Sequence, residues 1–467
     1  MEACKRRSRS AHRPGGGPFR VAVLSGLLLA GVAGEPWTAG AVAQTPPGVT
    51  LPELLNQLEI ASPEIRRAEG LVAAARERVA PAGALPDPML TAGFMNVPVP
   101  TFDLSREGMS MAVFEVGQRF PARGVRPAQT RIANARAEEL IHRRQEIGLS
   151  LRVRAAELYA EVLFIDESMG VLSEMQGFLD ELAELARVRL AEGSGSQADV
   201  IRTLTEVTRI DERRSELRGE RSRAEAGLSA LLDAPIPSGF AAQLPEGWSR
   251  LRSIPVTTEG FARAVPESMP ETALPPLSEL LERSRREHPA LLAAHAAVAV
   301  MEAEVELAER ERRPDVAVMV GYGARSGMDD VWSATVSIGL PVFRGRKQEP
   351  LVRAASHDVE AGRERARGVR AQQDALVTAA WSDLVRARER LHLVERLVLP
   401  QAAATVESAL AGFRTGSEGA SFLSVLDALM TLYTSEMERA RAALDLIRAL
   451  AGLEGATGSV PLLDLEP

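Results

Sequence analysis

Apolar and polar residues alternate strictly in one short stretch of the second half of the chain. The apolar positions are Trp332, Ala334, Val336, Ile338 and Leu340, and between them lie Ser333, Thr335, Ser337 and Gly339. This two-residue period predicts a β-strand with one apolar face and one polar face. The stretch 332–341 pairs with 314–323 across a turn-rich loop, and 88–97 pairs with 109–118 in the same way, so we expect two β-hairpins.

The first hairpin has a less regular pattern than the second. Its two segments place Glu115 on a face that should be uniform and scatter Met89, Met109 and Met111. We expect these methionines to face lipid or to pack against neighbours; their thioethers would also suit Cu(I), which is the weaker hypothesis.

Most of the remaining chain carries the spacing of long helices. In each half, apolar residues recur every three or four positions between charged ones: Leu158, Val162, Ile165, Met169, Leu172, Leu179, Leu182 and Ala186, then Leu384, Leu391, Val394 and Val398. Such stripes predict coiled-coil seams in helices over 128–191 and 351–414, each about 64 residues or roughly 95 Å long. Shorter helical patterns cover 51–83, 197–233 and 277–313. Two short helices laid end to end match the length of one long helix. We therefore expect helical hairpins in which one arm is a continuous helix and the other consists of two shorter helices end to end.

The order of elements repeats. Leu51, Pro63 and Pro88 correspond to Leu277, Pro289 and Pro314, each pair 226 residues apart. A repeat of this length indicates a duplicated half. We therefore divide the chain into a leader (1–43), a first repeat (44–233), a proline-rich linker (234–276), a second repeat (277–456) and a tail (457–467).

The first residues have the layout of a secretory signal peptide. Basic residues precede an apolar run over 21–33, and small residues at Ala41 and Ala43 predict cleavage after Ala43. The single cysteine, Cys4, would leave with the leader, so we expect no disulfide and no cysteine metal site. A formal net charge of −8 argues against nucleic acid as a partner.

Four strands of this length could cross a bilayer when tilted, but in lipid their open edges would leave backbone groups unpaired. Closure would need other copies: three copies give twelve strands, whereas two give eight, a number whose interior is filled by side chains. In such a barrel Ser333, Thr335, Ser337 and Gly339 would line the lumen, and Trp332 would face lipid. A soluble β-layer packed on the helices is the alternative interpretation.

At this point the sequence resembles the TolC family of outer-membrane efflux channels over nearly the whole mature chain. The resemblance rests on the leucine-rich opening of each half, on the "PARGVR" and "PVFRGRKQ" junctions, and on the turn motifs "GSGSQADVIRTLTEV" and "GASFLSVLDALMTLY". It implies a mainly α-helical fold with a small membrane β-barrel: a homotrimer whose twelve-stranded barrel continues into a helical periplasmic tunnel. The stretch "VWSATVSIGLPVFRGRKQ" is most similar to the branch that serves heavy-metal pumps of the resistance-nodulation-division class.

The resemblance also implies roles for particular residues. Gly193, Gly416 and Gly419 match tip turns that contact a periplasmic adaptor protein, while Asp427, Asp199 and Ser424 match positions around the periplasmic aperture. Many family members carry a second aspartate where this chain has Ser424. The implied partners are the adaptor, an inner-membrane pump and outer-membrane lipid, with no cofactor and no metal site.

Two other classes of protein are alternatives. The first is a periplasmic coiled-coil adaptor or scaffold without a pore, but strands and tips at opposite ends of repeated halves disfavour it. The second is a secreted enzyme or binding protein, for which the sequence offers no catalytic constellation. We therefore predict an outer-membrane exit duct that is passive and is not an enzyme.

Overall fold

The computed structural model describes residues 49–99, 103–105, 107–236, 240–242, 276–415 and 421–458. All of them belong to one compact unit, Pro46–Pro467. The predicted leader, most of the linker, the end of the tail and the predicted tip residues Gly416 and Gly419 lie outside the described residues.

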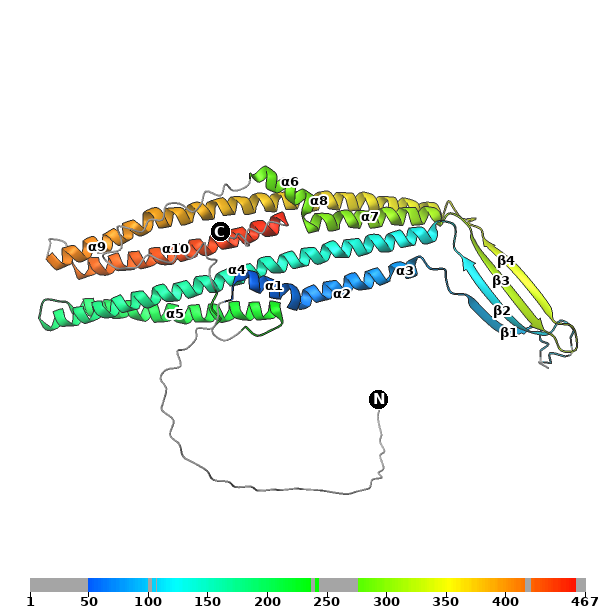
Figure 1. Cartoon of the computed structure of the whole chain (residues 1–467), viewed down its shortest axis with the longest axis horizontal. Helices are drawn as coiled ribbons and strands as arrows, with labels where there is room; N and C mark the ends of the chain where they lie inside the picture. The colour runs from blue at the N-terminus through cyan, green and yellow to red at the C-terminus, as the bar shows by residue number, and fades with distance from the viewer. Residues whose placement is uncertain are drawn as a thin grey trace, which may run out of the picture. The chain divides into compact units, whose positions relative to one another are not determined.

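The described elements follow the predicted order twice (Figure 1). The first half contains α1 (Leu51–Ala61), α2 (Pro63–Glu77), α3 (Val79–Ala82), β1 (Met89–Met95), β2 (Met111–Phe120), α4 (Val125–Ala191) and α5 (Gln197–Leu232). The second contains α6 (Leu277–Glu287), α7 (Pro289–Arg310), β3 (Asp315–Ala324), β4 (Val331–Gly339), α8 (Gln348–Leu393), the π-helical segment η2 (Val394–Val398), α9 (Leu399–Thr415) and α10 (Phe422–Thr457).

Each predicted opening helix is divided by a proline. Pro63 and Pro289 stand at the first positions of α2 and α7, and the residues before them, Ser62 and His288, are extended with ψ of 124°. A residue before proline is held out of the helical region, which ends one helix and lets the next begin. The helical stretches expected over 51–83 and 277–313 are thus built from successive helices: α1, α2 and α3 in the first half, and α6 and α7 in the second.

The second long helix is also interrupted. The predicted stripe is buried at Leu384, Leu391 and Val394, but Val398 is 37% exposed and Leu399, at 3%, takes its place. The π-helical turn of η2 adds one residue to the helix and so moves the buried position forward by one. Pro400 follows directly and has no N–H to donate to the preceding turn, which accounts for the location of the break.

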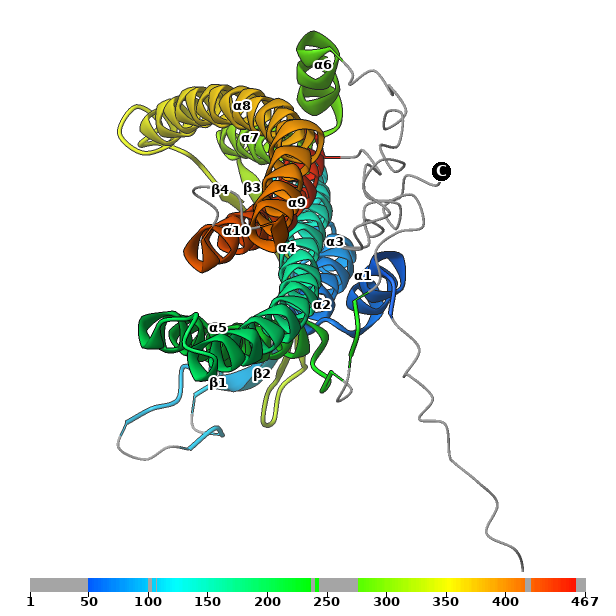
Figure 2. The same ribbon diagram turned by 90° about the vertical axis from the view of Figure 1, so that its left-hand side faces the viewer.

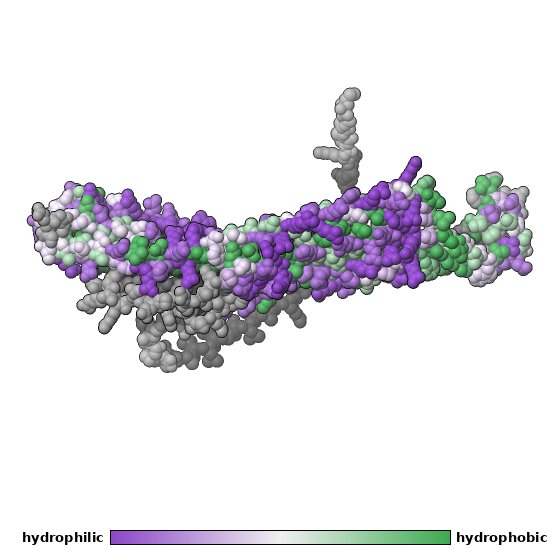
Figure 3. Space-filling model, turned by 90° about the horizontal axis from the view of Figure 1, so that it is seen from above, coloured by the Kyte–Doolittle hydropathy of each residue, from purple (hydrophilic) through white to green (hydrophobic). Residues whose placement is uncertain are grey.

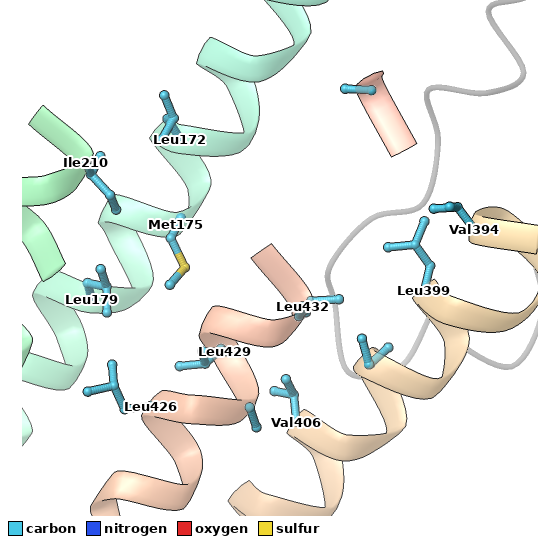
Figure 4. Packing of buried hydrophobic residues seen from close by; sticks show 14 of the residues in the cluster. Leu172, Met175, Leu179, Ile210, Val394, Leu399, Val406, Leu426, Leu429 and Leu432 are labelled. Atoms are coloured by element: carbon cyan, nitrogen blue, oxygen red, sulfur yellow. The ribbon is translucent and has the colours of Figure 1, made fainter. Parts of the chain in front are cut away.

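The short helices do lie end to end along the long ones. Helix α4 packs against α5 over one part of its length and against α2 over another, while α10 and α7 share the side of α8. The helices thus form a layer in the order α8 with α9, α10 with α7, α4, and α5 with α2 (Figure 2). Near the tips the layer is held by Leu172, Met175 and Leu179 of α4, which pack with leucines of α10 such as Leu426 (Figure 4).

His288 connects the end of α10 to the start of α7, where the two helices meet end to end. Its Nδ1 accepts a hydrogen bond from Ala290 N at 3.2 Å, which caps α7, and its Nε2 donates to the Gly455 carbonyl of α10 at 3.0 Å. Burial lowers the pKa of His288, opposed by the Gly455 carbonyl and by Glu146 on α4. The folded chain therefore favours the neutral ring, which leaves Nδ1 free to accept.

We expect stability to fall as the pH drops from about 6.5 through the lowered pKa of His288, because the unfolded chain takes up the proton first. Protonation would also remove the cap, which is worth about 1 kcal/mol. Thermal denaturation at two pH values would measure this, with His288→Asn as the comparison, since asparagine caps a helix and does not titrate. An equal loss of stability on acidification in both proteins would contradict the assignment.

The four strands form one antiparallel sheet in the order β1-β2-β3-β4. Its register pairs Thr91 with Glu115, Glu115 with Gly321, and Gly321 with Ser333. Strands β1 and β4 are the two edges of this sheet. Among the described helices, none is long and apolar enough to cross a membrane.

Candidate functional site

The register divides the sheet into two faces of opposite character, because residues directly opposite each other point to the same side. We call the first the apolar face. It consists of Leu90, Ala92, Phe94, Ala112, Phe114, Val116, Gln118, Phe120, Val316, Val318, Val320, Tyr322, Ala324, Trp332, Ala334, Val336 and Ile338. Most of its large side chains are exposed in the single chain, with Trp332 75% and Val336 63% exposed, whereas Val316, Val318 and Tyr322 are half-buried. Figure 3 shows apolar residues gathered at the end of the molecule that carries the strands.

The opposite side is the Ser333 face. It consists of Met89, Thr91, Gly93, Met95, Met111, Val113, Glu115, Gly117, Arg119, Asp315, Ala317, Met319, Gly321, Gly323, Val331, Ser333, Thr335, Ser337 and Gly339. The predicted lumen residues of β4 thus share one face with Glu115. The irregular alternation of the first hairpin disappears once its partner strand is known.

All four methionines within the strands lie on the Ser333 face: Met89, Met95, Met111 and Met319. Of the two roles expected for the hairpin methionines, facing lipid or packing against neighbours, the shared face and the contacts that follow favour packing. Two of them cover glycines, since a Cβ on Gly117 would lie 3.1 Å from Met319 Cγ and one on Gly323 would lie 2.6 Å from Met111 Sδ. Their role visible in the structure is to pack across glycine positions of the neighbouring strand.

Charged residues also sit on the Ser333 face, at the end of the sheet next to the helices. Arg119 forms an ion pair with Asp315, whose other carboxylate oxygen accepts a hydrogen bond from Ala122 N at 3.0 Å. This contact joins β2 and β3 just before α4 begins.

The turn between α4 and α5 lies at the end of the long helices opposite the sheet (Figure 1). Helix α4 ends at Ala191, and two residues later Gly193 has a φ of 73°, in the left-handed region that favours glycine. Two residues on, Gly195 donates to the Arg189 carbonyl at 2.9 Å, and a Cβ there would come within 2.9 Å of Leu190 N. The turn therefore needs both glycines for different reasons, and the sequence analysis had singled out only Gly193.

The predicted aperture residues lie near the starts of the two returning helices: Asp199 and Ser424 in the first turns of α5 and α10, and Asp427 in the second turn of α10. Asp199 lies in the first turn of α5, where Ser196 caps the helix, and a carboxylate there interacts favourably with the helix dipole. Asp427 is an exposed residue of α10, and its backbone carbonyl accepts a hydrogen bond from the Thr431 hydroxyl at 2.8 Å. Ser424 forms the capping box of α10 with Ser421, and its hydroxyl donates to the Ser421 carbonyl at 2.7 Å. The roles of these three residues at an aperture stay predictions.

One contact between the tips was not visible in the sequence. The Arg189 guanidinium of α4 lies 4.7 Å from the ring centroid of Phe413 on α9, and Phe413 packs edge-to-face against Phe422 of α10. These three residues connect the first helical hairpin to the second at its tip. No sequence signal pairs residues so far apart without knowledge of the helix order.

A buried ion cluster lies further along the layer. Arg439 of α10 is only 8% exposed and donates to Glu167 of α4 at 2.6 Å and to Glu436 at 3.0 Å. Burial raises the pKa of Glu395 in η2, opposed by the charges of Arg439 and Arg396. The described residues contain no group of three histidine, cysteine or acidic side chains placed to hold a metal ion.

Comparisons with known proteins agree with this geometry. A sequence profile described as outer membrane efflux protein matches residues 54–234 and 280–459. Protein CyaE of Bordetella pertussis is 24% identical over 278 residues, covering 57% of this chain and 53% of that protein. The pyoverdine export outer membrane protein OpmQ of Pseudomonas putida is 24% identical over 328 residues, covering 68% and 63%. The chain thus spans between about half and two thirds of the length of these curated relatives.

The same fold occurs in solved structures. The outer-membrane channel OprN superposes with a TM-score of 0.70 at 20% sequence identity, covering 88% of this chain and 90% of that one. Similarity at this level of identity shows the fold alone.

Proposed function

The chain belongs to the outer membrane efflux protein family, and on that premise we propose that it is the outer-membrane channel of a tripartite efflux or export system. It would be a passive exit duct, with transport driven by an inner-membrane pump. The observation that carries this proposal is the sheet with one apolar face, one Ser333 face and two open edges. A sheet of this kind suits a wall between lipid and water.

The order and direction of the elements support ring closure with further copies. Strands alternate in direction from β1 to β4, and the helix layer alternates from α8 with α9 to α5 with α2. The sheet and the helix layer are each four elements wide, which is an even number. A second copy placed beside the first, with the same orientation, therefore continues the alternation of direction in both the sheet and the helix layer. Three copies would form a barrel of twelve strands, and β4 of each copy would pair with β1 of the next, leaving no edge unpaired in lipid.

The tips are the proposed docking end. We propose that Gly193, Gly416 and Gly419 contact a periplasmic adaptor, and that Asp427, Asp199 and Ser424 lie around the aperture. Carboxylates in a ring favour cations, which agrees with heavy-metal cations as one class of cargo and a pump of the resistance-nodulation-division class. Export of pyoverdine, in the name of OpmQ, shows that a relative serves another cargo.

The proposal predicts that the membrane-extracted protein conducts ions in a planar bilayer and runs as a heat-sensitive trimer on gels. We expect small, cation-selective currents that grow or lose selectivity in Asp427→Ser, because the variant removes a carboxylate from the aperture. Glu64→Gln, an exposed change on α2, is the matched control and should have no effect.

Each other outcome has a definite meaning. Large currents that Asp427→Ser leaves unchanged would keep the channel and discard this aperture residue. A well-folded protein that never inserts would favour the scaffold without a pore.

A further inference from the structure

We propose that Glu115 sets the cation preference of the part of the channel that the strands line, separately from the aperture. This inference rests on the proposed function, since it requires the Ser333 face to line the conduit. Glu115 lies in the middle of β2, and the alternation of the first hairpin did not explain its position. The sheet and the helix tips lie at opposite ends of the long helices (Figure 1).

The charge inventory of the Ser333 face singles out this carboxylate. Only Glu115, Arg119 and Asp315 are ionisable among the residues of that face. Arg119 and Asp315 pair with each other, so their charges largely cancel. The structure gives Glu115 no ion pair and no hydrogen bond to any described side chain. One uncompensated negative charge per copy therefore remains on this face.

The position of the Glu115 side chain is defined by a glycine on the next strand. A Cβ on Gly321 would lie 3.2 Å from Glu115 Cγ, 3.4 Å from its Oε1 and 2.5 Å from Ser333 Oγ. The side chain thus lies across Gly321 toward Ser333 instead of standing away from the sheet. Thr91, on the other side of Glu115 in the same row, adds a second hydroxyl to this face.

This arrangement has the properties of a selectivity element. A carboxylate that lies flat leaves the passage wide and stays in contact with water, so it attracts cations without binding them tightly. Its field reaches about one Debye length, roughly 8 Å at physiological ionic strength, into the passage. Three copies would place three such carboxylates at one level of the strands, with hydroxyls beside them.

The test is the reversal potential of single channels in a roughly tenfold KCl gradient, from about 0.01 M to about 0.1 M. At these concentrations the Debye length is about 30 to 10 Å, so the charge of Glu115 is only partly screened. We expect Glu115→Gln, which keeps the shape of the side chain, to lower the cation-to-anion permeability ratio by about twofold or more. Glu115→Asp keeps the charge and should keep the ratio. Glu64→Gln again serves as the control at a distance.

Both measurements are made in the native chain and in Asp427→Ser, so that a dominant aperture does not mask the strands. A permeability ratio that Glu115→Gln leaves unchanged in both backgrounds would overturn the inference while the channel itself stands. A loss of the ratio in Glu115→Asp equal to that in Glu115→Gln would also overturn it, because shape instead of charge would then be responsible. No current from any of the variants or from the native chain would instead refute the proposed function.

Discussion

Replacing Val336 with arginine is expected to abolish assembly in the outer membrane, whereas the same change at the neighbouring Thr335 should leave assembly intact. The two residues are adjacent on β4 and point to opposite faces. Val336 lies on the apolar face, beside Val318 of β3. An arginine on a lipid-facing strand position costs about 2–4 kcal/mol near the middle of the bilayer, and each copy in a ring would bear that cost.

The measurement is the amount of heat-sensitive trimer in the outer-membrane fraction after expression. Thr335→Arg is the matched control, because it adds the same side chain one residue away, on the face proposed to meet water. Equal loss of trimer in both variants would mean that the two faces do not separate lipid from water. Normal assembly of Val336→Arg would contradict the proposed orientation of the sheet.

Loss of Arg439 is expected to be the most destabilising single change within the helix layer. Its guanidinium lies between Glu167 on α4 and Glu436 on α10, with Glu395 of η2 near enough to feel its charge. Removing one partner of a buried ion pair leaves charge without compensation, which costs about 3–5 kcal/mol. Arg439→Met keeps most of the apolar stem and removes the guanidinium with its charge and hydrogen bonds, so we expect it to be nearly as destabilising as Arg439→Ala.

Thermal unfolding of the extracted protein, followed by its helical circular dichroism, would measure this effect. Arg386→Ala on α8 is the control, because Arg386 pairs with Asp383 at 2.8 Å while its side chain is 75% exposed. Exposed pairs contribute about 0–1 kcal/mol. Comparable decreases in the unfolding temperature of the two variants would show that the Arg439 cluster is not a buried network.

Lowering the pH should reduce the loss of stability in Arg439→Met. Because the pKa of Glu395 is raised, this carboxylate becomes neutral at a higher pH than an ordinary glutamate.

Much of the proposed chemistry depends on which face of the sheet each strand residue occupies, which the alternation of the sequence made clear for β4 but not for β2. In β4 the small residues Ser333, Thr335 and Ser337 alternate so regularly that the two faces are evident from the sequence. In β2 the equivalent face carries Glu115 and Met111 beside Val113, so polarity alone does not identify it. The ladder from β4 through β3 assigns that face, because directly paired residues share a side.

The helices show the same division at longer range. The stripe from Leu158 to Ala186 was predicted well because helical periodicity is a local property of the chain. The π-helical turn before Pro400 was missed, although a proline inside the helix predicted over 351–414 was itself a signal of an interruption. Two features combine residues from separate helices: the cluster around Arg439 and the contact of Arg189 with Phe413. No local sequence pattern predicts such contacts.

The sequence by itself determined the kinds of element, their duplication and the lengths that make one long helix match two short ones. It did so because periods of two and of three to four residues are set by backbone geometry within a single element. Only the tertiary structure decided which residues of different elements face one another: Glu115 over Gly321, His288 against Gly455, and Arg439 between two carboxylates. Those pairings depend on strand register and helix packing, which arise from contacts between distant parts of the chain and are not set by any one segment.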